Sequence, residues 1–258
     1  MLIGGLQKFS LLDYPEHLAA IIFTQGCNFR CRFCYNPMLV ASTESGKFKK
    51  GHHLIHPSTK DFGERVKEGD LFDFLKSRLG KLEGVVITGG EPTLHSDLPE
   101  FIAKIKKMGF KVKLDTNGTN TEMLLLLLAK EGVGVRFGGE PALVDYIAMD
   151  IKAPLEKYEK VVGAAVDFTK IKQSIKIIMS SGLPYEFRTT VVPGLHSRAD
   201  IVKMGELIKG AKKWYLQFFK SDIDLVDEKL KGKKAFSKKE MEEMAEVGRR
   251  YVKKCEIR

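Results

Sequence analysis

The alternation of short apolar runs with amphipathic segments is the feature that most limits the folds open to this 258-residue chain. Six strands are predicted, in alternation with segments whose apolar residues recur with helical period. The predicted strands cover residues 19–24, 85–88, 111–114, 146–151, 187–192 and 214–219, and the helices cover 71–79, 97–108, 121–130, 168–180, 199–209 and 238–253. Such repetition is typical of right-handed βαβ units around a parallel sheet. We therefore predict an α/β fold, a partial (β/α)6 TIM-type barrel with mainly parallel strands.

No shift in composition marks a boundary, so a single domain is predicted over residues 1–258. Residues from about 44 to 69 are rich in Lys, His, Gly and Ser and are expected to form a flexible basic loop. The net charge of +10 would suit an acidic partner or a nucleic acid, or simply a Lys/Glu-rich surface. Because the lysines are spread rather than gathered with aromatics, we favour the surface interpretation and expect no nucleic acid.

The cysteine content and the termini indicate a reducing compartment. Four cysteines are too few for a secreted disulfide scaffold of this length. Residues 1–10 lack a basic segment followed by an apolar core, and the longest aliphatic run, residues 124–128, is far shorter than a membrane span. We expect a cytoplasmic protein without a membrane partner.

Polar motifs follow four successive predicted strands at their carboxyl ends, where parallel βα folds carry their sites. The motifs are a cysteine-rich loop at residues 25–36, Gly-Gly-Glu-Pro at 89–92, Asp-Thr-Asn-Gly at 115–118 and Asp-Ile-Lys at 150–152. Their coincidence at one edge of the sheet predicts an active site there.

The cysteine-rich loop predicts an inorganic centre. Cys27, Cys31 and Cys34 are separated by three residues and then by two, close enough for three thiolates to converge. A structural zinc site would need a fourth ligand, for which His52, His53, His56 and Cys255 are the candidates. The spacing differs from the two-residue gaps usual in zinc knuckles and favours a [4Fe-4S] cluster with one iron open to substrate. A solvated role is favoured for the three histidines and a buried one for Cys255.

Together with Phe33 before the third cysteine, these motifs resemble the radical S-adenosylmethionine (SAM) superfamily. The runs from Gly4 to Pro15 and from Phe23 to Asn28 resemble its glycyl-radical-activating branch. Within that branch the chain is most similar to activating proteins of anaerobic ribonucleoside-triphosphate reductase, and more distantly similar to pyruvate formate-lyase activating enzyme.

The resemblance implies roles for individual residues. Cys27, Cys31 and Cys34 would hold the [4Fe-4S] cluster, and the amino and carboxylate groups of SAM would chelate the fourth iron. The residues that would bind SAM are Phe33, Gly89, Gly90, Glu91, Asp115, Thr116, Asn117, Asp150, Lys152 and Gln217. Asp115 and Asp150 would in addition hold a monovalent cation. Gln217 is equally compatible with a place in the core or at the rim.

Two positions complicate the comparison. Many relatives have histidine directly after the third cysteine, where this chain has Tyr35, so any role of that histidine does not carry over. Gly-Gly-Glu-Pro also occurs a second time, at residues 138–141. That copy lies only four residues before the predicted strand 146–151, too close for a parallel crossover, and is interpreted as a loop.

The implied activity is reductive cleavage of SAM, followed by hydrogen abstraction from a glycine of a partner enzyme. The absence of a second cysteine-rich cluster suggests an external one-electron donor such as flavodoxin or ferredoxin, in an anaerobic setting. Arg188 and His196 flank the end of the fifth predicted strand and are candidates for contact with a peptide substrate. The alternatives are a radical SAM enzyme acting on a small molecule or another peptide, and a non-catalytic iron–sulfur or zinc-binding protein.

Overall fold

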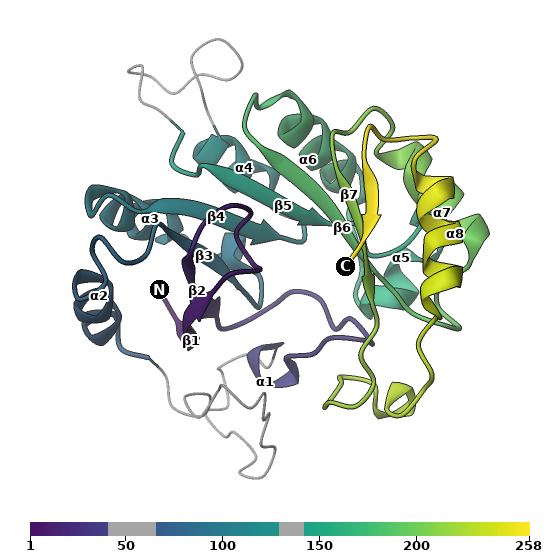
Figure 1. Ribbon diagram of the computed structural model, residues 1–258, viewed down its shortest axis with the longest axis horizontal. Coiled ribbons are helices and arrows are strands. Elements are labelled where there is room, and N and C mark those ends of the chain that lie inside the picture. Colours follow the sequence, from purple (N-terminus) through teal and green to yellow (C-terminus); the bar gives the residue numbers. More distant parts are fainter. Residues whose placement is uncertain (41–65, 129–141) are drawn as a thin grey trace. The chain divides into compact units, whose positions relative to one another are not determined.

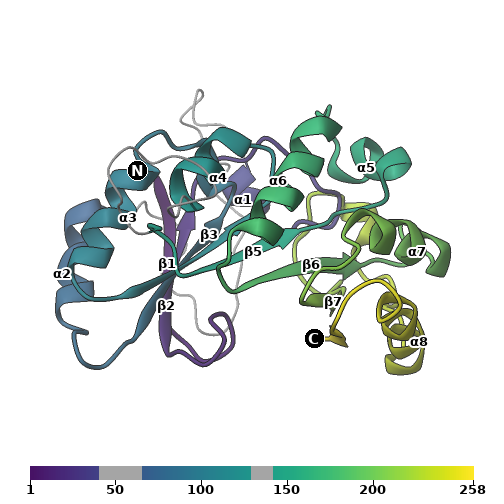
Figure 2. The ribbon, with the colours of Figure 1, turned by 90° about the horizontal axis from the view of Figure 1, so that it is seen from above.

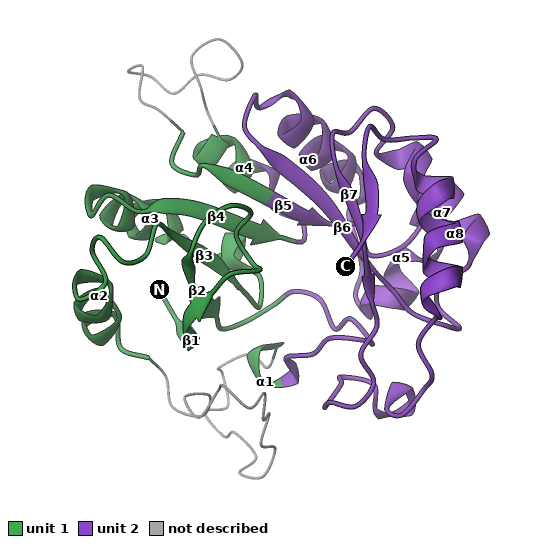
Figure 3. Ribbon diagram, in the orientation of Figure 1, with its two compact units in different colours: residues 1–27, 38–116, 122–147 green, residues 28–37, 117–121, 148–258 purple. Residues whose placement is uncertain are grey.

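The computed structural model describes residues 1–40, 66–128 and 142–258. These residues divide into two compact units (Figure 3). Unit 1 consists of residues 1–27, 38–116 and 122–147, and unit 2 consists of residues 28–37, 117–121 and 148–258. Figures 1 and 2 show the strands and helices of both units along the chain.

Unit 1 is built on a parallel sheet with one antiparallel strand. Its strands are β1 (Ile3–Ser10), β2 (Ala19–Thr24), β3 (Gly84–Gly89) and β4 (Lys111–Thr116), followed by the start of β5 (Tyr146–Asp150). β1 pairs antiparallel with β2, whereas β2–β3 and β3–β4 are parallel. The helices are α1 (Pro37–Val40), α2 (Glu68–Lys76), α3 (Leu98–Lys107) and α4 (Thr121–Leu128), with a 3-10 turn, η2, at Pro92–Leu94.

Unit 2 continues the alternation of strand and helix. It contains the end of β5, then β6 (Tyr185–Val191), β7 (Trp214–Phe218) and β8 (Cys255–Ile257), and the pairs β6–β7 and β7–β8 are parallel. Its helices are α5 (Leu155–Val162), α6 (Phe168–Ser180), α7 (Arg198–Leu207) and α8 (Lys238–Gly248), with a 3-10 turn, η3, at Glu228–Leu230. The strand order of the sheet, β1 to β8, equals the order in the chain.

The apolar runs form strands because their side chains are buried on both faces of the sheet. Val85, Val86 and Ile87 of β3 are fully buried, as expected for a strand covered on both sides. Within unit 1, one cluster of buried residues packs Ile21 and Val86 against two tyrosines, Tyr14 and Tyr146. The predicted α/β class with a mainly parallel, unclosed sheet is therefore confirmed.

Four elements differ from the sequence prediction. β1 and β8 were not expected, so the described residues form eight strands rather than six. α5 was also missed, because its eight residues between short loops give only a brief periodic signal. The last helix ends at Gly248 rather than near residue 253, since Gly248 lies against the Cys255 side chain as the chain turns back into β8.

Several predictions fall outside the described residues. They are the basic loop up to residue 65 with His52, His53 and His56, the end of the helix predicted at 121–130, and the second Gly-Gly-Glu-Pro at 138–141. The single domain over residues 1–258 stays a prediction. In the parts of the chain that are described, no helix combines the length and apolarity needed to span a bilayer. Cys255 is buried in β8, as expected.

Truncating the unit 1 core should be costly. We expect Ile21→Ala to lower the free energy of unfolding by about 2–4 kcal/mol, because it leaves a cavity beside Val86 and Tyr14. Urea unfolding followed by circular dichroism measures this change. Leu12→Ala is the control: Leu12 is 86% exposed, so its change should stay within about 0.5 kcal/mol. Equal effects of the two variants would contradict this assignment of the core.

Candidate functional site

In unit 1 the Gly-Gly-Glu segment after β3 lies directly on the backbone that leads into Cys27. The amide of Gly90 donates to the Thr24 carbonyl at 2.8 Å, and the amide of Glu91 donates to the Gly26 carbonyl at 2.8 Å. A Cβ at Gly90 would collide with the same Gly26 carbonyl. Gly89 has φ of 111°, a conformation open to glycine, and its missing side chain gives space to the Thr24 amide. Both glycines are therefore required by backbone contact.

Glu91 is buried and held in one orientation. Its Oε1 accepts hydrogen bonds from the Thr93 amide at 3.2 Å, the Thr93 hydroxyl at 2.5 Å and the Thr116 hydroxyl at 2.7 Å. Thr116 ends β4, so the carboxylate links the ends of two neighbouring strands. Such preorganisation suits an acceptor for a cationic ligand group.

His95 also supports the approach to Cys27, and sequence reasoning missed it. Its Nε2 lies 3.0 Å from the carbonyl oxygen of Gln25, and Gln25 Nε2 donates to the Met38 carbonyl at 3.1 Å. Because a carbonyl can only accept, Nε2 of His95 carries the proton. Burial lowers the pKa of His95, which keeps the ring neutral. The sequence feature that could have indicated His95 is its position three residues after Pro92, directly after η2.

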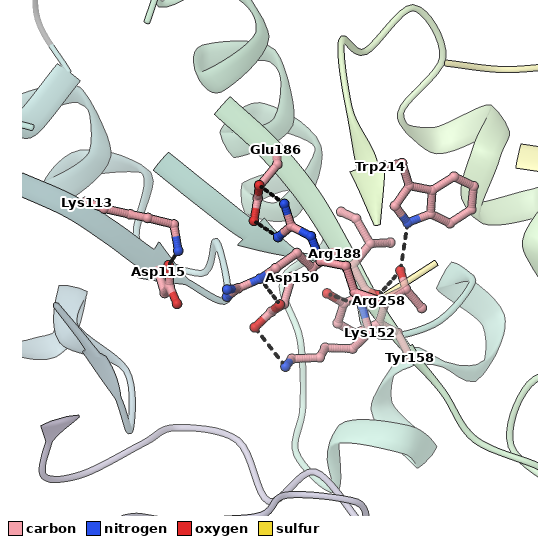
Figure 4. Close-up of polar contacts among 11 residues, drawn as sticks. Lys113, Asp115, Asp150, Lys152, Tyr158, Glu186, Arg188, Trp214 and Arg258 are labelled. Atoms are coloured by element: carbon pink, nitrogen blue, oxygen red, sulfur yellow. Dashed lines mark hydrogen bonds and ion pairs between the residues drawn. The ribbon is translucent and has the colours of Figure 1, made fainter. Parts of the chain in front are cut away.

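Asp115 pairs with a buried lysine that was likewise not anticipated. Lys113 Nζ lies 2.7 Å from Asp115 Oδ1, and Lys113 is only 1% exposed (Figure 4). The two residues are two positions apart on β4, so they point to the same face of the strand. The sequence feature that could have indicated this pair is the spacing of Lys113 and Asp115, two charged residues at alternate positions of an otherwise apolar strand.

In unit 2, the cysteine-rich loop is fixed by its own backbone and by α5. The Cys34 amide donates to the Cys31 carbonyl at 2.9 Å, and the amides of Arg30 and Arg32 donate to the Val162 and Val161 carbonyls. These carbonyls belong to the last turn of α5, where helix carbonyls lack intrahelical partners. The missed helix α5 therefore serves to hold the loop.

The Cys34 thiol lies beside a backbone amide and two positive charges. Its Sγ accepts from the Asn36 amide at 3.5 Å, the kind of bond that supports cluster thiolates. Burial raises the pKa of the Cys34 thiol, while the Asn36 amide and the charges of Lys152 and Arg30 act in the opposite direction. Three thiols within eight residues are nevertheless the donor type that an iron–sulfur cluster takes.

A second contact fixes the start of the loop to the turn after β4. Asn117 Nδ2 donates to Asn28 Oδ1 at 2.8 Å, and Asn28 Nδ2 donates to the Thr119 hydroxyl at 2.9 Å. Asn117 Oδ1 accepts from the amide and the hydroxyl of Thr119. Asn117, expected to contact SAM, thus connects two polar loops within unit 2.

Tyr35 anchors the loop to the end of β7. Its hydroxyl donates to the Phe218 carbonyl at 3.3 Å and accepts from the Lys220 amide at 2.9 Å. Burial raises the pKa of Tyr35, so the phenol stays protonated. Gln217, one residue before Phe218, is half-buried on the same strand.

Asp150 is the electrostatic centre of unit 2 (Figure 4). Lys152 Nζ donates to Asp150 Oδ2 at 3.0 Å, and Arg188 Nε donates to Oδ1 at 3.1 Å. Burial acts to raise the pKa of Asp150, but the charges of Arg188 and Lys152 outweigh it and the pKa is lowered. For Lys152, burial acts to lower the pKa and the charge of Asp150 outweighs it, so the pKa is raised. All three side chains are therefore charged.

The expected site residues fall into both units. Cys27, Gly89, Gly90, Glu91, Asp115 and Thr116 belong to unit 1, and Cys31, Phe33, Cys34, Asn117, Asp150, Lys152, Arg188, His196 and Gln217 belong to unit 2. Among the described residues, no three His, Cys, Asp or Glu side chains form a ready metal centre. The shared cation site of Asp115 and Asp150 and the SAM contacts remain predictions.

Comparison with known proteins identifies the family. Residues 21–208 match the sequence pattern described as the radical SAM superfamily. The chain belongs to the radical SAM superfamily. Enzymes of this superfamily use a [4Fe-4S] cluster and SAM, so this chain is a radical SAM enzyme with those cofactors.

Two curated relatives extend over most of the chain. The chain is 32% identical over its whole length to a protein of Methanocaldococcus jannaschii and covers 95% of that protein. The name of that protein assigns it provisionally as a glycyl-radical enzyme activating enzyme. It is 27% identical to the pyruvate formate-lyase-activating enzyme of Streptococcus mutans, over 82% of this chain and 73% of that protein.

Solved structures share the fold at low sequence identity. QueE from Escherichia coli has a TM-score of 0.50 at 19% identity, with 84% of this chain and 83% of that chain covered. Streptococcus suis SuiB bound to the precursor peptide SuiA has a TM-score of 0.58 at 14% identity, with 92% and 48% covered.

Adding a methyl group at Gly90 should separate the Gly-Gly-Glu segment from the backbone before Cys27. We expect Gly90→Ala to cost about 1–3 kcal/mol of stability, because the new Cβ displaces the Gly26 carbonyl and weakens the bond from Glu91. Urea unfolding of the metal-free protein measures the change. In the control Gly69→Ala the new Cβ meets nothing within 4 Å in a helix, so stability should rise slightly. A neutral Gly90→Ala would contradict the contact.

We expect Asp150→Asn, which removes the charge of this side chain, to lower the free energy of unfolding by about 3 kcal/mol near pH 7. This value is at the low end of the cost of breaking a buried ion pair, because the Asp150 side chain is still 23% exposed. Asp150 contributes fully above its unfolded pKa of about 3.9, and the contribution is lost as the pH falls through the lower folded value.

The pH dependence separates this effect from simple loss of packing. Urea unfolding between pH 3 and 6 should show a steeper acid loss for the wild type than for Asp150→Asn. Asp73→Asn, which removes an exposed i,i+3 pair with Lys76, should change stability by less than about 0.5 kcal/mol. Parallel curves for wild type and Asp150→Asn would refute the role of Asp150.

Proposed function

We propose that this protein uses SAM to generate a glycyl radical on a partner enzyme, of the anaerobic ribonucleotide reductase or pyruvate formate-lyase-like class. The observation that carries the proposal is the similarity over the entire chain to an activating enzyme of this kind. It is supported by the charged Asp150–Lys152 pair at the end of β5, the Asp-x-Lys motif of that branch.

The proposed residue roles follow from the donor chemistry. Cys27, Cys31 and Cys34 would hold the [4Fe-4S] cluster, which when bound supplies the electron for reductive cleavage of SAM. Glu91, with its orientation fixed by Thr93 and Thr116, would accept from the ammonium of the methionine moiety. Gly89 and Gly90 would allow the backbone to approach that moiety closely.

The cations around Asp150 would receive anionic groups. Lys152 is charged and would bind the methionine carboxylate, while Asp150 holds its ammonium in place. Phe33 lies beneath Lys152 Nζ, 5.8 Å from the ring centroid, and would contact the flat part of the ligand. Thr116, Asn117 and Gln217 are the further proposed SAM contacts, and Asp115 with Asp150 the proposed cation site.

Arg188 is proposed to contact the glycine-bearing segment of the partner. Its Nε binds Asp150, and its side chain is 13% exposed, so it lies at the limit of solvent access. An external one-electron donor such as flavodoxin or ferredoxin is proposed as the second partner. We place the protein in an anaerobic cytoplasm on the same grounds.

Anaerobic reconstitution with iron and sulfide, reduction and addition of SAM tests this function. We expect 5′-deoxyadenosine from the wild type and none from Cys31→Ala. Cys255→Ala is the matched control, because Cys255 is buried in β8 outside the loop, and it should keep the activity. A wild type that binds only zinc, or that forms a cluster and never cleaves SAM, would refute the proposal.

The glycyl radical itself is tested with a partner present. We expect a glycyl-radical EPR signal on an added glycyl radical enzyme only with SAM, reductant and wild-type protein together. Cleavage of SAM without transfer to any glycyl radical enzyme would instead support the alternative of a radical SAM enzyme for a small molecule or another peptide.

A further inference from the structure

His196 is a buried histidine whose two ring nitrogens are both used inside unit 2. It lies in the turn between β6 and α7 and is 4% exposed. The Val192 amide donates to Nδ1 at 2.9 Å, and Nε2 lies 2.8 Å from the Lys152 carbonyl oxygen. Neither nitrogen is available for the substrate contact expected from the sequence.

The hydrogen-bond partners of the ring determine which nitrogen carries the proton. A backbone amide can only donate and a carbonyl can only accept, so Nδ1 is unprotonated and Nε2 carries the hydrogen. Only the neutral imidazole with its proton on Nε2 satisfies both bonds. The charged groups that act on the ring are Asp200 and Lys157, which oppose each other, and burial lowers the pKa of His196. The geometry and the surroundings thus favour the same neutral form.

The turn that carries His196 is stiff. The amides of Leu195 and His196 both donate to the Val192 carbonyl, and Gly194 takes the positive φ of 82° that the turn needs. Ser197 caps α7 in a reciprocal pair with Asp200, and Asp200 also binds Lys157. The imidazole is therefore presented from a fixed backbone rather than from a loose loop.

Two residues expected to bind SAM contact this ring, Lys152 through its backbone and Phe33 through its side chain. Its Nε2 holds the backbone of Lys152, the residue whose ammonium binds Asp150. Its edge faces Phe33 of the cysteine-rich loop, with ring centroids 6.1 Å apart at 71°. Phe33 in turn lies under Lys152 Nζ. His196 thus joins the end of β5 to the segment between Cys31 and Cys34.

We propose that His196 is a positioning residue that sets Lys152 and Phe33 for SAM, chiefly through its bond to the Lys152 carbonyl. The inference rests on the proposed use of Lys152 for the methionine carboxylate. Two other hydrogen bonds hold this backbone: the Ile151 amide donates to the Arg188 carbonyl, and the Lys152 amide donates to the Tyr158 hydroxyl. Without His196, the Lys152 carbonyl loses its own partner and the backbone is held by these two bonds alone. The ammonium would then sample positions that do not meet the carboxylate.

Two substitutions separate the two bonds of the ring. In His196→Gln the amide nitrogen occupies the place of Nε2 and can donate to the Lys152 carbonyl. In His196→Asn the amide oxygen occupies the place of Nδ1 and can accept from Val192, but it cannot reach Lys152. His17→Gln is the matched control, since His17 pairs with Glu83 in unit 1.

Each variant is reconstituted and assayed for SAM cleavage without a partner enzyme, and SAM binding is titrated by EPR of the reduced cluster. For His196→Asn we expect the KM for SAM and the EPR midpoint to rise about tenfold, with kcat within about threefold. For His196→Gln and His17→Gln both quantities should stay within about threefold of the wild type. Equal behaviour of the Asn and Gln variants, or a loss confined to kcat, would overturn the proposal.

Fluorescence of the single tryptophan, Trp214, shows whether each variant folds. If a variant does not fold, a measurement on the unsubstituted protein still tests the proposal. Nitrogen-15 NMR of the cluster-free wild type should show His196 as the neutral Nε2–H form near pH 7. Any other tautomer overturns the proposal. A wild type that never cleaves SAM refutes the proposed function instead, while NMR still decides the ring's bonds.

Discussion

The pairing of one carboxylate with two cations at the end of β5 is the interaction on which the site in unit 2 depends. Asp150 holds Lys152 from its own strand end and Arg188 from β6. Buried charges of one sign repel unless an opposite charge lies between them. Because Asp150 supplies that charge, two cations can be kept close together and charged.

The cysteine-rich loop depends on the same region for its shape. Its residues 28–37 belong to unit 2, where their backbone binds the last turn of α5 and residues 226–227. The Tyr35 hydroxyl binds the end of β7. Arg32 adds an ion pair with Asp227. A loop without regular structure keeps its shape only when its polar backbone is satisfied, and here helix ends and strand ends provide the partners. The backbone around Cys31 and Cys34 is thereby fixed within unit 2.

Unit 1 contributes backbone rather than charge to the approach. Gly89 and Gly90 lie too close to neighbouring backbone for side chains, and the amides of Gly90 and Glu91 donate to the Thr24 and Gly26 carbonyls. The exceptions are Glu91, whose orientation is fixed by two threonine hydroxyls, and the buried Lys113–Asp115 pair. Close backbone packing is therefore the main contribution of unit 1, and the paired charges of Asp150, Lys152 and Arg188 are the main contribution of unit 2.

The sequence by itself determined the α/β class, the polar strand ends and the family, because these depend on local periodicity and spacing. It could not show β1 or β8, since Gly-rich or three-residue strands carry little periodic signal. Only the tertiary structure decided that Thr116 binds Glu91, that Asn117 binds Asn28, and that His196 binds the Lys152 backbone. These contacts join residues brought together by folding, and hydrogen-bond geometry over such distances is not written in any local stretch of the chain.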